Sequence, residues 1–314
     1  MQALNYLRQA REYFANSIKK INKSQLTKEK RKDIEGHEMI LDHASKAQKF
    51  ILPDGGRIFN DDLKGLPDLW NLPYPAIVIE YCAPKGSIGL AERIYGSTVQ
   101  CPKRIVYAEQ NGEEITVISI TSTNVAGAEM WFIQDYCAIM AKNRKASDTF
   151  SGPFEKLGKK IEELKLETSS LDCATNYCPM FSYSQINEDR LARAYVDMSD
   201  EIRAVVELVE ALSCVNVKPQ RIPAKQWRNV GKKKALQFDD YHILTVNNSS
   251  KVGTGEARPH GSPREHLRRG HIRKLADGRK LWINSCVVNA GVGGRVFKDY
   301  GVIGYNNGKR EQVA

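Results

Sequence analysis

Three of the six histidines in this chain lie in one basic segment near its C-terminal end, at residues 258–274. They are His260, His266 and His271, and arginines surround them on both sides. An imidazole can take up or release a proton near neutral pH, and a guanidinium can bind a phosphate through two donors. A nuclease that cleaves a phosphodiester without a metal needs both groups, with His266 and His271 as the catalytic pair. Without catalysis the same side chains would bind phosphate, and we favour this interpretation.

A second basic cluster lies at residues 225–234 and contains one aromatic residue, Trp227. An indole can stack on an unpaired base while neighbouring lysines follow the phosphate backbone, as in proteins that bind single strands. The alternative is that Trp227 anchors a loop on the core. The two clusters together predict eleven nucleic-acid contacts: Arg264, Arg268, Arg269, Arg273, Lys274, Arg279, Trp227, Arg228, Lys232, Lys233 and Lys234.

The positive charge of the chain is concentrated in its last hundred residues. Residues 215–314 contain 20 Lys and Arg against 7 Asp and Glu, a net charge of +13, whereas the whole chain carries +10. A basic segment on a nearly neutral body is typical of a phosphate-binding surface, because each neutralised phosphate releases condensed counterions. The alternatives are a solubilising tail or a surface that docks on an acidic partner protein.

Residues 266–282 have the pattern His-x-Arg-Arg-Gly-His-Ile-Arg-x-Leu-x-x-Gly-Arg-x-x-Trp. The positions marked x are occupied by Leu267, Lys274, Ala276, Asp277, Lys280 and Leu281. Downstream follow a Val-Val pair at 287–288 and Gly-Arg-Val-x-Lys-Asp-Tyr at 294–300. This string resembles the C-terminal module of a group of proteins encoded by bacteriophages and plasmids. The resemblance implies a mobile-element origin and assigns no catalytic role to any residue.

These observations predict a phage-type accessory protein that binds nucleic acid, RNA or DNA, through a basic C-terminal module and acts on host nucleic acid or host defence. One alternative is a protein-binding inhibitor of a host defence or replication factor. Another is the metal-independent ribonuclease that would use His266 and His271. The expected partners are therefore nucleic acid, a host protein, or both.

The motifs of several enzyme classes are missing from the sequence. It contains no GxxxxGK phosphate loop, no GxGxxG that opens a helix after a strand, no HExxH and no GxSxG. We therefore expect no cofactor. Metal sites are also not expected, since few carboxylates and no cysteines lie near the clustered histidines in the sequence. Glu80 ends a predicted buried strand where a metal-dependent nuclease might hold its ion, but a surface cap is the interpretation we favour.

Hydrophobic periodicity predicts the elements that must position these residues. Apolar residues at helical spacing indicate helices over 2–22, 28–49 and 187–212, and the last has the clearest pattern in the chain. Strands at 104–109 and 114–121 flank Asn111 and Gly112, a strong signal for a β-hairpin. Further strands are expected at 75–81, 215–217, 241–246, 281–288 and 295–300. Residues 130–140 read equally well as a strand or a buried helix.

The fold class expected from this pattern is α/β (α+β), with a mixed sheet, several helices and a small basic β module. We expect N-terminal helices in residues 1–50, an α/β body in 51–246 and the basic module in 247–314, after a linker rich in Gly and Pro. The seven cysteines are odd in number and scattered among apolar neighbours, which is typical of reduced thiols. No apolar run approaches the length of a membrane span, so we expect a cytoplasmic protein that has no membrane partner.

Overall fold

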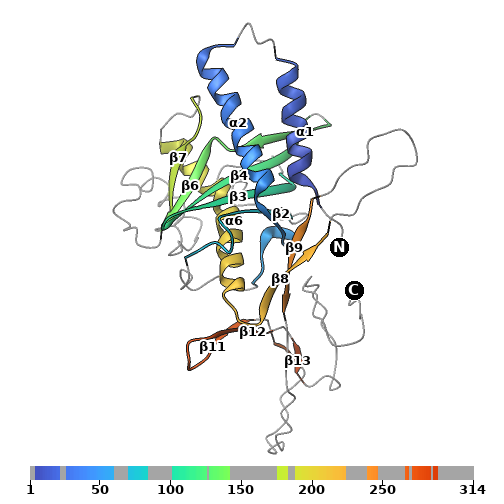
Figure 1. Ribbon diagram of the computed structural model, residues 1–314, viewed down its shortest axis with the longest axis vertical. Helices are drawn as coiled ribbons and strands as arrows, with labels where there is room; N and C mark the ends of the chain where they lie inside the picture. The colour runs from blue at the N-terminus through green and yellow to red at the C-terminus, as the bar shows by residue number, and fades with distance from the viewer. Residues whose placement is uncertain are drawn as a thin grey trace, which may run out of the picture.

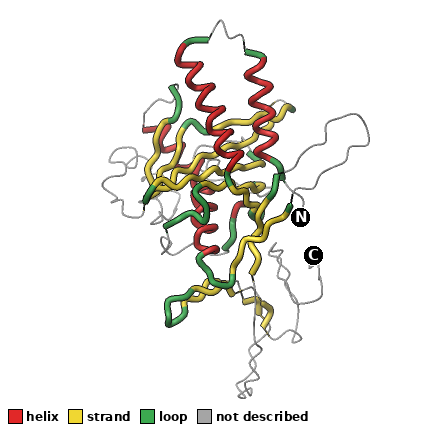
Figure 2. The backbone as a smooth tube through the Cα atoms, viewed as in Figure 1, coloured by secondary structure: helices red, strands yellow, loops and turns green. Residues whose placement is uncertain are grey.

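The computed structural model describes residues 4–21, 26–59, 70–83, 101–125, 127–141, 175–182, 188–223, 239–246, 266–268, 271–283 and 286–288. Within these residues three α-helices surround a mixed sheet of nine strands (Figures 1 and 2). This confirms the expected α/β class. The linker expected after residue 246, the basic cluster at 225–234 and the strand expected at 295–300 lie outside the described residues.

The strands of the large sheet lie in the order β7-β6-β4-β3-β2-β1-β9-β8, and β5 also pairs with β4. The two pairings of β1, with β2 and with β9, are parallel, and every other pairing in this sheet is antiparallel. The strands are β1 (Gln48–Ile51), β2 (Ala76–Cys82), β3 (Lys103–Asn111), β4 (Glu114–Val125), β5 (Ala128–Ile133), β6 (Tyr136–Ala141), β7 (Thr175–Pro179), β8 (Val217–Ile222) and β9 (Tyr241–Val246).

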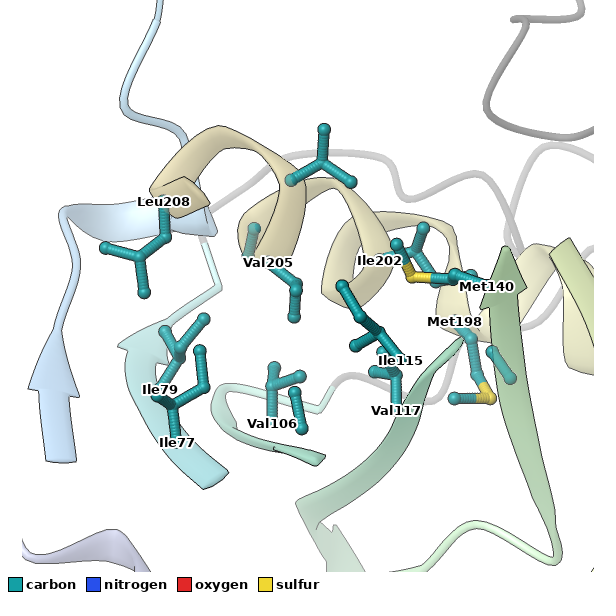
Figure 3. Packing of buried hydrophobic residues seen from close by; sticks show 14 of the residues in the cluster. Ile77, Ile79, Val106, Ile115, Val117, Met140, Met198, Ile202, Val205 and Leu208 are labelled. Atoms are coloured by element: carbon teal, nitrogen blue, oxygen red, sulfur yellow. The ribbon is translucent and has the colours of Figure 1, made fainter. Parts of the chain in front are cut away.

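Helices cover both faces of this sheet. α1 (Tyr6–Lys19) and α2 (Lys28–Lys46) pack on one face, and α6 (Glu188–Leu212) packs on the other. Successive side chains of a strand point to opposite faces, so β2 serves both cores: Ile77 and Ile79 contact the α6 side, and Val78 contacts the side of α1 and α2. Figure 3 shows the α6 core, where Val205 lies opposite the sheet residues. Because β2 is buried on both faces, it is apolar at nearly every position.

The exception in β2 is Glu80, which is fully buried and binds the N-terminus of α1. Its carboxylate accepts hydrogen bonds from the backbone N–H groups of Tyr6 (3.0 Å) and Leu7 (2.9 Å) and from the hydroxyl of Tyr241 in β9 (2.9 Å). Helix α1 has no cap of its own: its N-cap residue, Asn5, has a left-handed backbone with φ 53° and no side-chain capping bond. Glu80 therefore supplies the acceptor and the negative charge that the helix N-terminus lacks.

This geometry corrects the expectation for Glu80. The residue does cap, but it caps a buried helix from inside a strand that continues to Cys82, and it does not lie at the surface or at a strand end. Its oxygens are occupied by three donors from the chain itself. In the part of the chain that the structure describes, no group of three His, Cys, Asp or Glu side chains could hold a metal ion.

Most predicted elements are confirmed, with shifts at their ends. The single strand expected at 281–288 is wrong, because two strands, Lys280–Ile283 and Cys286–Val288, lie there and belong to different sheets. The helix expected over 187–212 is α6, and the hairpin around Asn111 and Gly112 is formed by β3 and β4. The helix expected over 28–49 ends at Lys46, because the next residues leave the helix to form β1. Residues 130–140 contain parts of two strands, β5 and β6, which both pair with β4. The strand expected at 215–217 starts only at Val217 and continues to Ile222.

Replacing Glu80 by alanine should strongly destabilise the fold. Glu80→Ala leaves two backbone N–H groups and the Tyr241 hydroxyl buried without their acceptor, which should cost on the order of 3 kcal/mol or more. Tyr241→Phe removes one of the three donors to Glu80 and should cost about 1 to 2 kcal/mol. Urea unfolding followed by circular dichroism measures both. Equal losses for the two variants would contradict a central role for the carboxylate.

The protonation of Glu80 should give stability a defined pH dependence. Burial raises the pKa of this carboxyl group above its usual value, and the donors from Leu7, Tyr6 and Tyr241 oppose that shift. The part of the free energy of unfolding that is linked to its protonation is therefore complete below the unfolded-state pKa of about 4.3 and is lost as pH rises through the folded-state pKa.

Glu80→Gln removes the titrating group, so we expect the stability difference between the parent and this variant to change with pH across that window. Urea unfolding of both proteins at a series of pH values from about 4 to 8 measures the difference. A difference that is the same at every pH would show that Glu80 does not titrate there.

Candidate nucleic-acid interface

Part of the predicted basic module forms a β-hairpin at one end of the molecule. β11 (His271–Lys274) and β12 (Lys280–Ile283) pair in antiparallel fashion, and we call them the basic hairpin. The backbone N–H of Leu275 donates to the carbonyl of Arg279 (2.8 Å) to close the turn, where Gly278 has a positive φ of 84°. Such a φ favours glycine. In Figure 1 the basic hairpin lies at the lower end of the described part of the chain and the tops of α1 and α2 lie at its upper end.

Trp282 attaches the basic hairpin to the body. Its side chain is buried and its ring lies 4.9 Å from the ring of Phe59, centroid to centroid. Its backbone N–H donates to Asn216 Oδ1 (2.8 Å), and its carbonyl accepts from Asn216 Nδ2 (2.7 Å). The backbone N–H of Val215 also donates to the carbonyl of Lys280 (3.0 Å). β12 is thus held against residues 215 and 216, which connect α6 to β8.

Three of the predicted contacts come together on this hairpin. Arg273 and Lys274 are adjacent, exposed residues at the end of β11, and Arg279 is exposed in the turn, immediately before β12. The guanidinium of Arg279 lies 2.7 Å from the carboxylate of Asp277, which lowers the pKa of Asp277. Both partners are exposed, so this ion pair is weak and a phosphate can compete for the guanidinium. The hairpin therefore presents three cations on the surface.

Not every cation of the hairpin is available to a ligand. Lys280 forms an ion pair with Glu210 of α6, at 2.7 Å, and both side chains are nearly buried. The ammonium group of Lys280 serves to fix the hairpin on the helix. The exposed cations of the hairpin are those of Arg273, Lys274 and Arg279.

The remaining predicted residues are placed only in part. His266 and Arg268 belong to β10 (His266–Arg268), which pairs with β13 (Cys286–Val288), and His271 opens β11 opposite Ile283. The two candidate catalytic histidines therefore belong to different two-stranded sheets. Outside the described residues lie Arg264, Arg269, Trp227, Arg228, Lys232, Lys233 and Lys234.

A buried polar cluster between α6 and the sheet was not predicted from the sequence. The guanidinium of Arg104, in β3, lies 2.6 Å from Glu201 Oε1, and the hydroxyl of Ser119 donates to the same oxygen (3.1 Å). Glu201 is fully buried, which raises the pKa of its carboxyl group, whereas the charge of Arg104 opposes that shift. Glu201 Oε2 and the hydroxyl of Tyr81 are buried and have no hydrogen-bond partner among the residues that the structure describes.

Two further carboxylates of α6 also bind cations from distant parts of the chain. Glu207 lies 3.0 Å from the guanidinium of Arg57 and accepts a hydrogen bond from the backbone N–H of Phe59 (2.9 Å). Glu210 binds Lys280, as described above. With Glu201, three buried acids on one helix hold three cations from three other segments. Their role is to fix those segments on α6.

The sequence carries one signal for this arrangement. Glu201 falls between Met198, Ile202 and Val205 in the apolar stripe of the helix, at a position where a side chain must be buried. A charged residue in such a stripe requires a buried partner of opposite charge. The sequence does not indicate which of its many Arg and Lys residues provides that partner.

Comparison of the chain with protein-family models, curated proteins and solved structures finds no match. Among the described helices, none combines the length and the apolar character needed to cross a membrane.

Loss of the Trp282 ring should release the basic hairpin from the body. Trp282→Ala removes a buried aromatic side chain, which should cost about 3 kcal/mol of local stability, because the contact with Phe59 is lost. Amide hydrogen exchange in β11 and β12 should then speed up by about a hundredfold. Exchange in β2 and β3 should stay as in the parent, and an equal increase there would show that the hairpin does not open separately.

Proposed function

We propose that this protein binds nucleic acid through its basic C-terminal segment and that the basic hairpin is part of the contact surface. The observation that carries the proposal is that Arg273 and Lys274 are both exposed, at the end of β11, on a hairpin that Trp282 holds on the body. This pair lies in the segment with a net charge of +13. Fixed cations lose little conformational freedom on binding, which favours affinity.

The chemistry of the hairpin fits a phosphate backbone. Arg273 and Arg279 can donate two parallel hydrogen bonds to one phosphate, and Lys274 can follow as a point charge. A two-stranded β-ribbon also has the dimensions to enter the major groove of duplex DNA. Cations of this kind position a protein on the backbone without reading sequence. The proposal is therefore one of backbone binding.

The biological setting that we propose follows from the resemblance at residues 266–282. A phage-type accessory protein in the cytoplasm of a bacterial host would meet host nucleic acid directly. Action on host nucleic acid or host defence is consistent with a basic surface that binds any phosphate backbone. His266 and His271 are assigned a binding role in this proposal.

Salt-dependent binding tests the proposal. Fluorescence polarisation of labelled single-stranded RNA, single-stranded DNA and duplex DNA should show an affinity that falls about a thousandfold between about 50 and 200 mM salt, as neutralisation of six or more phosphates predicts. Absence of binding at the lower salt concentration would overturn the proposal and favour an acidic partner protein. A gel of the same samples should show intact probes, and shortened probes would instead indicate a ribonuclease or deoxyribonuclease.

A double variant tests the hairpin itself. Arg273→Gln with Lys274→Gln should make the loss of affinity between the two salt concentrations about tenfold smaller, because two phosphate contacts are removed. The matched control is Arg11→Gln with Lys46→Gln, which removes two exposed cations from α1 and α2. If the hairpin variant behaves as the control does, the basic hairpin is not a contact surface.

A further inference from the structure

The ends of α1 and α2 that are farthest from the sheet form a second basic surface. The buried residues of α1 are Tyr6, Leu7 and Ala10, all in its first half, and those of α2 lie in its second half. The remaining turns project beyond the sheet, side by side (Figure 1). We call residues 19–21 and 26–32, where α1 ends and α2 begins, the helical tip.

The helical tip is held in place by contacts below it. The ring of Phe14 in α1 lies 5.6 Å from the ring of His37 in α2, and His37 lies 4.3 Å from Phe181, which follows β7. Asp33 accepts hydrogen bonds from the backbone N–H (2.8 Å) and the hydroxyl (2.6 Å) of Ser182. The two helices are thus braced against the end of β7, and the projecting turns have a defined position.

The charge on the helical tip is strongly positive. Five lysines are exposed there, and in the part of the chain that the structure describes no carboxylate lies within salt-bridge distance of their ammonium groups. Helix α2 also directs its positive N-terminal end to this surface, with Thr27 as the cap of its first turn. The acidic side chain exposed within the tip is Glu29. The five lysines are Lys19, Lys20, Lys28, Lys30 and Lys32.

The composition of the tip favours a nucleic-acid backbone over a protein surface. Protein interfaces are rich in Tyr, Trp, Phe, Met and Arg and poor in Lys, because a stable interface needs a desolvated apolar centre. The tip has no aromatic residue, and its exposed large apolar side chain is Ile21, at 38%. A phosphate backbone requires only positive charges at the surface, and counterion release provides the free energy of binding.

We propose that the helical tip is a phosphate-binding surface for nucleic acid, separate from the basic hairpin. The two surfaces lie at opposite ends of the part of the chain that the structure describes (Figure 1). The proposal stands on the tip residues alone, so it holds whether or not the C-terminal segment binds. If both surfaces bind, one protein molecule contacts two separate stretches of phosphate backbone, and the two contacts reinforce each other through their high effective concentration.

The test is the salt dependence of binding by the full chain to a labelled DNA duplex of about 30 base pairs. Lys20→Gln with Lys28→Gln removes two tip charges, and glutamine preserves helix propensity. We expect the loss of affinity between about 50 and 200 mM salt to become about tenfold smaller than in the parent. Circular dichroism should show an unchanged fold.

The control is the pair Arg11→Gln with Lys46→Gln, on the same two helices but away from the tip. Lys46 ends α2, and Arg11 lies about 12 Å along α1 from its tip end. This variant should keep the salt dependence of the parent. If the tip variant also keeps it, the proposal is overturned and an acidic protein surface becomes the expected partner of the tip.

The hairpin variant, Arg273→Gln with Lys274→Gln, separates this proposal from the previous one. If only the tip variant has a weaker salt dependence of binding than the parent, the result supports the tip and contradicts the hairpin as a contact surface. If only the hairpin variant has a weaker salt dependence, the result supports the hairpin and overturns the proposal for the tip. If both variants have a weaker salt dependence, and the four substitutions combined weaken it further, the result supports two separate surfaces.

Discussion

The carboxylate of Glu80 is the interaction on which the arrangement of the central layers depends. It lies in the middle of the structure, on a strand that is buried on both faces, and its oxygens bind the first turn of α1 and the Tyr241 hydroxyl of β9. A carboxylate in such a place is tolerated only if its oxygens are satisfied, so a shift of α1 or of β9 would remove donors that it needs. The N-terminal helix, the central strand and a strand from late in the sequence are thus held by one side chain.

The same principle operates on the other face of the sheet, through α6. Its three buried carboxylates bind Arg104 of the sheet, Arg57 of the segment after β1 and Lys280 of the basic hairpin. Replacing any one partner would leave a buried charge behind, so these pairs specify where each segment packs more than they add to stability. The position of the exposed cations at the end of the molecule is therefore a consequence of acidic residues in its core.

Sequence reasoning recovered the local features of the fold. Helix α6 and the β3–β4 hairpin were predictable because their signals lie within one short window, an apolar stripe in one case and Asn111 with Gly112 in the other. The basic cluster around Arg273 and Lys274 was visible in the composition, but the strand β11 that carries these two residues was not expected. The strand order and the role of Glu80 were not predictable, because each depends on a partner far away in the sequence. The contact between the rings of Trp282 and Phe59 was not predictable from the sequence either.

The place of β9 in the sheet has a consequence for how the chain acquires its structure. β9 lies between β1 and β8, so one edge of β1 stays open until residues 241–246 have been synthesised. Parallel pairing between segments so far apart in sequence is slow, since the entropy cost of closing a long loop comes before the contacts that offset it. A nascent chain on the ribosome therefore carries an unpaired strand edge for most of its synthesis, and this edge can pair with other chains during that interval.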